Sequence, residues 1–116
     1  MAKVFFGFAL ADSMFGAVGA CTITRRPLTV EQVAAEVAAG VTSCCNPSHG
    51  ATIDAMRQRF GLDMEIPETP PRVSLAHGDS VIVMGVRGLP RLTDRHEYTV
   101  EEVAKATFDF AEYTVG

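Results

Sequence analysis

Tryptophan is absent from the chain, lysine is scarce, and the three cysteines do not suit a disulfide framework. Cys21, Cys44 and Cys45 are odd in number and two of them are adjacent, which favours a reducing compartment over secretion. A formal net charge of −4 gives none of the basic excess that duplex DNA or a membrane surface attracts. The sequence has no apolar run near the roughly 20 residues that span a bilayer. We therefore expect a cytoplasmic protein that binds neither duplex DNA nor membranes.

The composition that is present suits one globular domain over residues 1–116. Hydrophobic residues make up 47% of the chain and charged residues 21%, which is enough apolar material for a core. Most of the ten cationic residues are arginines, whose planar guanidinium grips phosphate at two points. Genomic base composition is the alternative explanation for this preference. A small anionic ligand in a local pocket is compatible with the acidic net charge.

The first part of the chain predicts two strands and a helix. Residues 3–11 form an apolar run that indicates an interior strand, an interpretation preferred over a short signal peptide. Residues 17–24 predict a second, weaker strand. Thr29 and Gln32 have the spacing of a capping box, so we expect a helix that begins after Thr29 and ends at Gly40.

A second helix is predicted over residues 49–60, after a turn-prone segment that contains Pro47. Ile53, Met56 and Phe60 recur at helical spacing and should form its buried stripe. The glycine that follows Phe60 should end the helix.

The sequence from residue 72 onward predicts three strands and one more helix. Residues 72–76 and 80–86 should pair around a tight turn at residues 77–79, with the second strand central because both its faces are apolar. Thr99 should open a third helix. Residues 108–115 predict the last strand, and the shift in its apolar parity indicates a bulge or burial on both faces. The predicted fold class is α/β (α+β), a single domain with a mixed sheet of about five or six strands flanked by about three helices.

The segment around His49 is the first candidate for chemistry. A histidine at the start of a helix lies beside unpaired backbone N–H groups, which together with the helix dipole bind anions. Gly50 leaves room for a phosphate near the backbone, and histidine can donate a proton near neutral pH. The alternative is a histidine that merely occupies a helix start.

An arginine-rich connection is the second candidate. Arg87, Arg91 and Arg95 surround Asp94 in a segment that follows the predicted central strand, and such loops often carry function. The alternative is a solvated charged turn.

Cysteine chemistry is a competing hypothesis. Cys44, Cys45 and His49 could join His77 or His96 around a metal, but their spacing matches no standard zinc pattern. A cysteine nucleophile beside His49 is the other form of this hypothesis. We therefore expect neither a metal nor another cofactor.

Several motifs occur in an order that resembles one family, the viral anti-CRISPR ring nucleases of archaeal viruses and bacteriophages. The resemblance runs from Lys3 to Val115. Its motifs are Phe5-Phe6-Gly7-Phe8-Ala9-Leu10-Ala11 with Ser13-Met14, Ser48-His49-Gly50-Ala51-Thr52, Arg72-Val73-Ser74-Leu75, His77-Gly78-Asp79 through Val86, Arg91-Leu92-Thr93-Asp94, and Tyr98-Thr99-Val100-Glu101-Glu102.

The resemblance implies a homodimer that degrades cyclic tetra-adenylate, the signal of type III CRISPR defence, without a metal. It assigns His49 as the acid, Arg91 as the residue that stabilises the charged phosphate, and Asp94 as a positioning group. The substrate-binding residues that it implies are Ala9, Leu10, Ala11, Ser13, Ser48, Gly50, Thr52 and Arg87.

The chain also departs from the family pattern. Phe8 and Ala11 stand where the family's opening has polar residues, and Thr93-Asp94-Arg95 replaces its Pro-Glu-Gly. These changes leave two alternatives to a ring nuclease: a protein that sequesters a cyclic nucleotide without cutting it, and a structural viral accessory protein.

Overall fold

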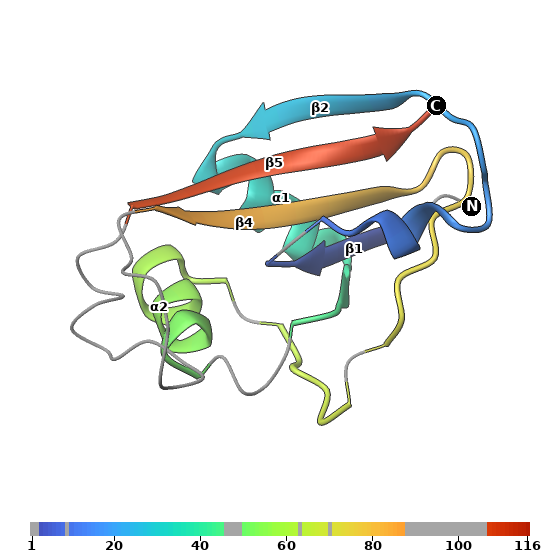
Figure 1. Ribbon diagram of the computed structural model, residues 1–116. Coiled ribbons are helices and arrows are strands. Elements are labelled where there is room, and N and C mark those ends of the chain that lie inside the picture. Colours follow the sequence, from blue (N-terminus) through green and yellow to red (C-terminus); the bar gives the residue numbers. More distant parts are fainter. Residues whose placement is uncertain (1–2, 9, 46–49, 63, 70, 88–106) are drawn as a thin grey trace.

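A computed structural model describes residues 3–8, 10–45, 50–62, 64–69, 71–87 and 107–116. They form a single compact domain with a five-stranded mixed sheet in the order β2-β5-β4-β1-β3 and two α-helices, an α+β fold (Figure 1). The predicted fold class is thus confirmed, while the helix predicted after Thr99 lies outside the described residues. The elements are β1 (Val4–Gly7), the 3₁₀ helix η1 (Asp12–Phe15), β2 (Ile23–Leu28), α1 (Val30–Ala39), β3 (Thr42–Ser43), α2 (Gly50–Phe60), β4 (Ser80–Arg87) and β5 (Thr107–Val115).

Strand β4 lies at the centre of the sheet, as its sequence predicts. It pairs in parallel with β1 and antiparallel with β5. Alternate side chains of a strand point to opposite faces, and here Val81 enters one core while Ile82 and Met84 enter the other. The register between β4 and β5 continues without a slip from Ser80↔Thr114 to Arg87↔Thr107. The parity shift in β5 therefore reflects burial on both faces, not a bulge.

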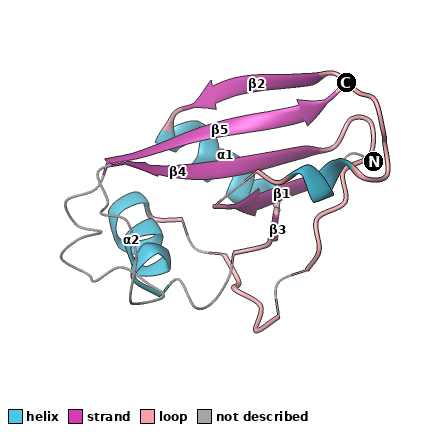
Figure 2. Cartoon of the chain, in the orientation of Figure 1, coloured by secondary structure: helices cyan, strands magenta, loops and turns pink. Residues whose placement is uncertain are grey.

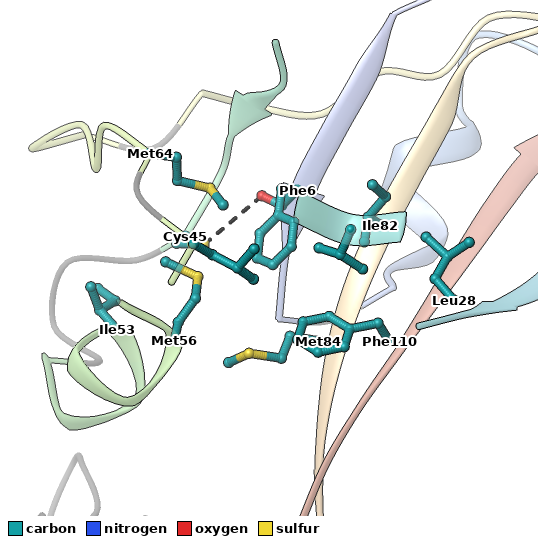
Figure 3. Packing of buried hydrophobic residues seen from close by; sticks show 11 residues of the cluster. Phe6, Leu28, Cys45, Ile53, Met56, Met64, Ile82, Met84 and Phe110 are labelled. Carbon is teal, nitrogen blue, oxygen red and sulfur yellow. Dashed lines mark hydrogen bonds between the residues drawn. The ribbon is translucent and has the colours of Figure 1, made fainter. Parts of the chain in front are cut away.

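The larger core lies between the sheet and the two helices. Val33 of α1 and Ile53 and Met56 of α2 are buried against it, and Figure 3 shows the α2 side chains extending toward Cys45 and the sheet. Phe60 makes edge-to-face contacts with Phe108 and Phe110 of β5. The stripe predicted for α2 is confirmed. The buried members of this core are Phe6, Leu28, Val33, Cys45, Ile53, Met56, Leu62, Met64, Ile82, Met84 and Phe110.

Local signals set the helix boundaries. The Thr29 hydroxyl accepts the Gln32 N–H at 3.2 Å and the Gln32 side chain accepts the Thr29 N–H at 2.8 Å, which confirms the capping box of α1. Gly40 follows α1 with φ of 114° and Gly61 follows α2 with φ of 65°. Glycine adopts these angles without the strain that other residues meet.

The opposite face of the sheet carries a smaller core that loops cover. It contains Val73 and Leu75, yet residues 72–76 are not a strand, contrary to the prediction. The Leu75 N–H donates to the Met14 carbonyl at 2.8 Å, so this segment is tied to η1 and not to β4. The alternation of apolar residues over 72–76 does not indicate a strand here, because a loop that lies over a sheet can also bury every second side chain.

The tight turn at residues 77–79 is confirmed. The Asp79 carboxylate accepts the N–H of Lys3 at 2.8 Å and the N–H of Ala76 at 3.0 Å. These bonds hold the pKa of Asp79 below its usual value. The turn therefore joins the starts of β1 and β4.

The strand predicted over residues 17–24 was placed too early. Strand β2 begins at Ile23, and its residues are exposed up to the buried Leu28. As an edge strand it tolerates Pro27, which lacks an N–H, and it carries Arg26 in an ion pair with Glu112 at 3.0 Å. The sequence of β2 is polar and contains a proline, so it lacks the apolar pattern that predicts a strand. Strand β3 is only two residues long and was not predicted (Figure 2).

Candidate functional site

The carboxyl ends of β1, β3 and β4 adjoin at one edge of the sheet. Strand β1 is parallel to both neighbours, with Phe5 opposite Thr42 of β3 and Val81 of β4. Figure 1 shows α2 beside this end of β4. Ligands of sheets with parallel strands bind outside the carboxyl ends of the strands. In the sequence, the three segments with the predicted site residues follow these three strands, so this edge is the candidate site.

Close packing joins the end of β1 to the segment that leads into α2. The Phe6 carbonyl accepts the Cys44 N–H at 2.8 Å and the Cys44 thiol at 3.1 Å. A side chain on Gly7 would lie 2.7 Å from the Cys44 sulfur, so any larger residue there would force the thiol to move. The Cys45 thiol lies 3.9 Å from the same carbonyl (Figure 3). These contacts fix the relative position of the first two candidate segments.

The two thiols are structural in this arrangement. Cys44 belongs to the smaller core and Cys45 to the larger one, so the adjacent side chains point to opposite faces. Burial raises the pKa of Cys44, and it raises the pKa of Cys45 to about 11. Since the thiolate is the nucleophilic form, protonated thiols disfavour the cysteine-nucleophile hypothesis.

No group of three His, Cys, Asp or Glu side chains suited to a metal occurs within the part of the chain that the structure describes. His77 is in that part, where its Nδ1 lies 2.7 Å from the Gly116 carbonyl. His49 and His96 are outside it.

The loop after β1 presents the first group of expected ligand contacts. Leu10 is 38% exposed, and Ala11 and Ser13 are exposed. Phe8, which stands where the resembled family has a polar residue, packs partly buried against the larger core. The loop thus turns Phe8 inward and Leu10 outward.

Helix α2 provides the second group. It begins at Gly50, immediately after His49 in the sequence. Thr52 in its first turn is only 9% exposed and Ile53 is buried, so the start of the helix is anchored to the core. The side chain of Thr52, an expected ligand contact, is therefore largely covered by the rest of the protein.

Arg87 ends β4 and pairs with Thr107 of β5. Asp109 of β5, which the sequence did not indicate as a site residue, lies nearby, and its carboxylate contacts the position that a side chain on Gly85 would occupy. A glycine inside a strand is a signal for such an approach. The expected site residues that lie outside the described residues are Ala9, Ser48, His49, Arg91 and Asp94.

Comparisons with known proteins show a shared fold. No protein-family model matches the chain, and no curated protein matches it. Among solved structures, the chain is similar to B116 of Sulfolobus turreted icosahedral virus, with a TM-score of 0.65 and 18% identity over 97% of this chain and 99% of that one. The neighbour is thus a virus protein whose fold matches over almost its full length. No helix in the described residues is long and apolar enough to cross a membrane.

Proposed function

We propose that the protein is a metal-independent phosphodiesterase that cuts a cyclic oligoadenylate, in particular cyclic tetra-adenylate, into short linear products and so antagonises type III CRISPR signalling. The observation that carries the proposal is that β1, β3 and β4, the strands that precede the three candidate segments, lie side by side with their carboxyl ends at the same edge of the sheet. The fold shared with a Sulfolobus virus protein supports a viral accessory role.

The chemistry needs no cofactor because RNA contains its own nucleophile. A ribose 2′-oxygen attacks the adjacent phosphorus, the bond from phosphorus to the 5′-oxygen breaks, and a 2′,3′-cyclic phosphate forms. His49 donates a proton to the departing 5′-oxygen, while the proton of the 2′-hydroxyl leaves to solvent. General acid catalysis of this kind contributes roughly 10²–10⁴ in rate.

Arg91 would stabilise the charge that develops on the phosphate, and Asp94 would orient Arg91 or the ribose. The first turn of α2 supports the same role, since backbone N–H groups at a helix start attract anions. The helix extends over Gly50–Phe60, and its first turn is held by the buried Ile53. A ring with two-fold symmetry suits two copies of the chain placed about the same axis, so we also propose a homodimer.

The test is cleavage of radiolabelled cyclic tetra-adenylate in EDTA by the wild type, by His49→Ala and by the control variant His77→Ala. His77 lies on the turn before β4, at the other end of that strand from Arg87. The proposal expects products from the wild type and from His77→Ala and a loss of at least 10²-fold in rate in His49→Ala. Tight binding of an intact ring by the wild type would instead establish a sequestering protein, and no binding would leave a structural role.

A further inference from the structure

Among the described strands, β2 has a pairing partner on one side only. It stands at the end of the order β2-β5-β4-β1-β3, and Figure 1 shows it as the outermost strand, beyond β5. All of its residues from Ile23 to Pro27 are exposed. An unpaired edge presents backbone N–H and C=O groups on which an additional strand can form. The register between β2 and β5 determines which groups these are.

The hydrogen bonds of β2 to β5 show which of its backbone groups point away from the sheet. The Gly116 N–H donates to the Thr22 carbonyl at 2.7 Å, and the adjoining residues Ile23 and Val115 are opposite each other. Opposed residues of an antiparallel ladder alternate between pairs that exchange hydrogen bonds and pairs that do not. Every second residue of β2 therefore directs its N–H and C=O outward. The outward-facing residues are Ile23, Arg25 and Pro27.

Pro27 agrees with this assignment. A proline has no N–H, and at an outward-facing position its presence costs the ladder with β5 no hydrogen bond. The outer edge thus offers the N–H and C=O groups of Ile23 and Arg25 and the C=O group of Pro27. An additional strand would find both donors and acceptors from Ile23 to Arg25 and would lack a donor at Pro27. Pairing is therefore limited to a short segment before the proline.

The side chains beside this edge are cationic and apolar. Arg25 lies on one face of the sheet, where its Nε donates to the Tyr113 hydroxyl at 3.2 Å. Arg26 lies on the other face, and its side chain remains 56% exposed beside the ion pair with Glu112. Ile23 is 42% exposed, one of two large hydrophobic residues exposed among those described. An additional strand would therefore meet a cation on each face and an apolar side chain.

Charged residues and a proline on an edge strand also protect it from unspecific pairing. Protection alone does not account for Ile23, because an exposed apolar side chain beside unpaired N–H and C=O groups favours pairing. We infer that the outer edge of β2 binds an extended acidic segment of another protein as an additional strand. Backbone bonds to Ile23 and Arg25 hold the segment, its carboxylates face Arg25 and Arg26, and an apolar residue packs on Ile23. This interaction goes beyond ring cleavage and does not depend on it.

The test measures the binding of a fluorescein-labelled peptide by fluorescence polarisation. The peptide contains the sequence Glu-Glu-Thr-Val, which in antiparallel pairing places its glutamates opposite Arg26 and Arg25 and its valine opposite Ile23. One control peptide has lysines in place of the glutamates. Another is N-methylated at the second glutamate and at the valine, whose N–H groups would bond to β2. The wild type should bind the acidic peptide at least about tenfold more tightly than either control.

Three variants assign the binding to the edge. Arg25→Glu should bind the acidic peptide about tenfold more weakly, and the lysine peptide more tightly, than the wild type does, because it reverses the charge that faces the peptide. The matched control Arg72→Glu makes the same change in net charge at an exposed position outside the sheet and should bind like the wild type. Ile23→Pro should lose binding, since it removes an outward N–H and leaves the bonds to β5 in place. Thermal melting followed by circular dichroism shows whether each variant is folded.

Hydrogen exchange followed by NMR gives a direct readout of the edge. The acidic peptide should slow exchange of the Ile23 and Arg25 N–H groups, while those of Thr24 and Arg26 are slow without it. Equal binding of the N-methylated peptide, equal effects of Arg25→Glu and Arg72→Glu, or no binding of the acidic peptide would overturn the inference. A wild-type dimer that Ile23→Pro converts to monomers would also overturn it, because a second copy would then occupy the edge. Ring cleavage is measured separately, so each of these results leaves the proposed function standing.

Discussion

Replacing Gly7 by alanine should destabilise the protein, because the added methyl group has no room at the end of β1. It would lie 2.7 Å from the Cys44 sulfur, whose thiol donates to the Phe6 carbonyl. Overpacking of this kind costs about 1–3 kcal/mol, and alanine returns about 0.5 kcal/mol by restricting the unfolded chain. The expected net loss is about 0.5–2.5 kcal/mol in the free energy of unfolding.

Urea denaturation followed by circular dichroism measures this loss, since the chain has no tryptophan for fluorescence. Gly16→Ala is the matched control, because its added carbon would approach nothing closer than the Ser13 carbonyl at 3.7 Å. In the double variant Gly7→Ala, Cys44→Ala the clash is absent, so it should be about 1 kcal/mol more stable than the sum of the single changes implies. Strict additivity, or a Gly7→Ala variant as stable as Gly16→Ala, would refute the proposed contact.

Three further predictions concern the core, the turn and the thiols. Met56→Ala, which empties a fully buried position, should lower the free energy of unfolding by about 2–5 kcal/mol in urea; a loss under 1 kcal/mol would contradict its place in the core. Asp79→Asn should lower stability at pH 7, because the N–H groups of Lys3 and Ala76 lose a charged acceptor. Because the pKa of Asp79 is lowered in the folded protein, the contribution of its carboxylate to stability is complete above the ordinary pKa near 4 and is lost as the pH falls from there through the folded pKa. The difference in the free energy of unfolding between the wild type and Asp79→Asn should therefore be smaller at pH 3 than at pH 7. Cys45, with its raised pKa, should resist alkylation at pH 8 in the folded protein and react in urea, as followed by mass spectrometry.

Local patterns predicted those elements whose causes are local. The capping box of Thr29 and Gln32 specified α1 by itself, and the doubly apolar run of β4 specified a central strand. Strand β2 was misplaced because an edge strand needs no apolar pattern. Strand β3 consists of two residues and depends on pairing with Phe5 and Phe6, a contact that no local pattern records.

The candidate site is predictable only in part for the same reason. The sequence indicates which residue types suit phosphate chemistry, but not that three segments share one edge, because that follows from the strand order. The approach of Cys44 to Gly7 and of Asp109 to Gly85 joins residues far apart in the chain. A glycine in a strand indicates that another group packs closely against the backbone there, but not which residue supplies that group.

The most direct measurement for the proposed function is mass spectrometry of the products formed from cyclic tetra-adenylate in EDTA. Attack by the 2′-hydroxyl consumes no water, so the account predicts linear fragments that end in 2′,3′-cyclic phosphates and whose masses sum to that of the ring. These fragments should form with the wild type and not with His49→Ala. An intact ring after prolonged incubation with saturating wild-type protein, or fragments formed equally by His49→Ala, would contradict the account.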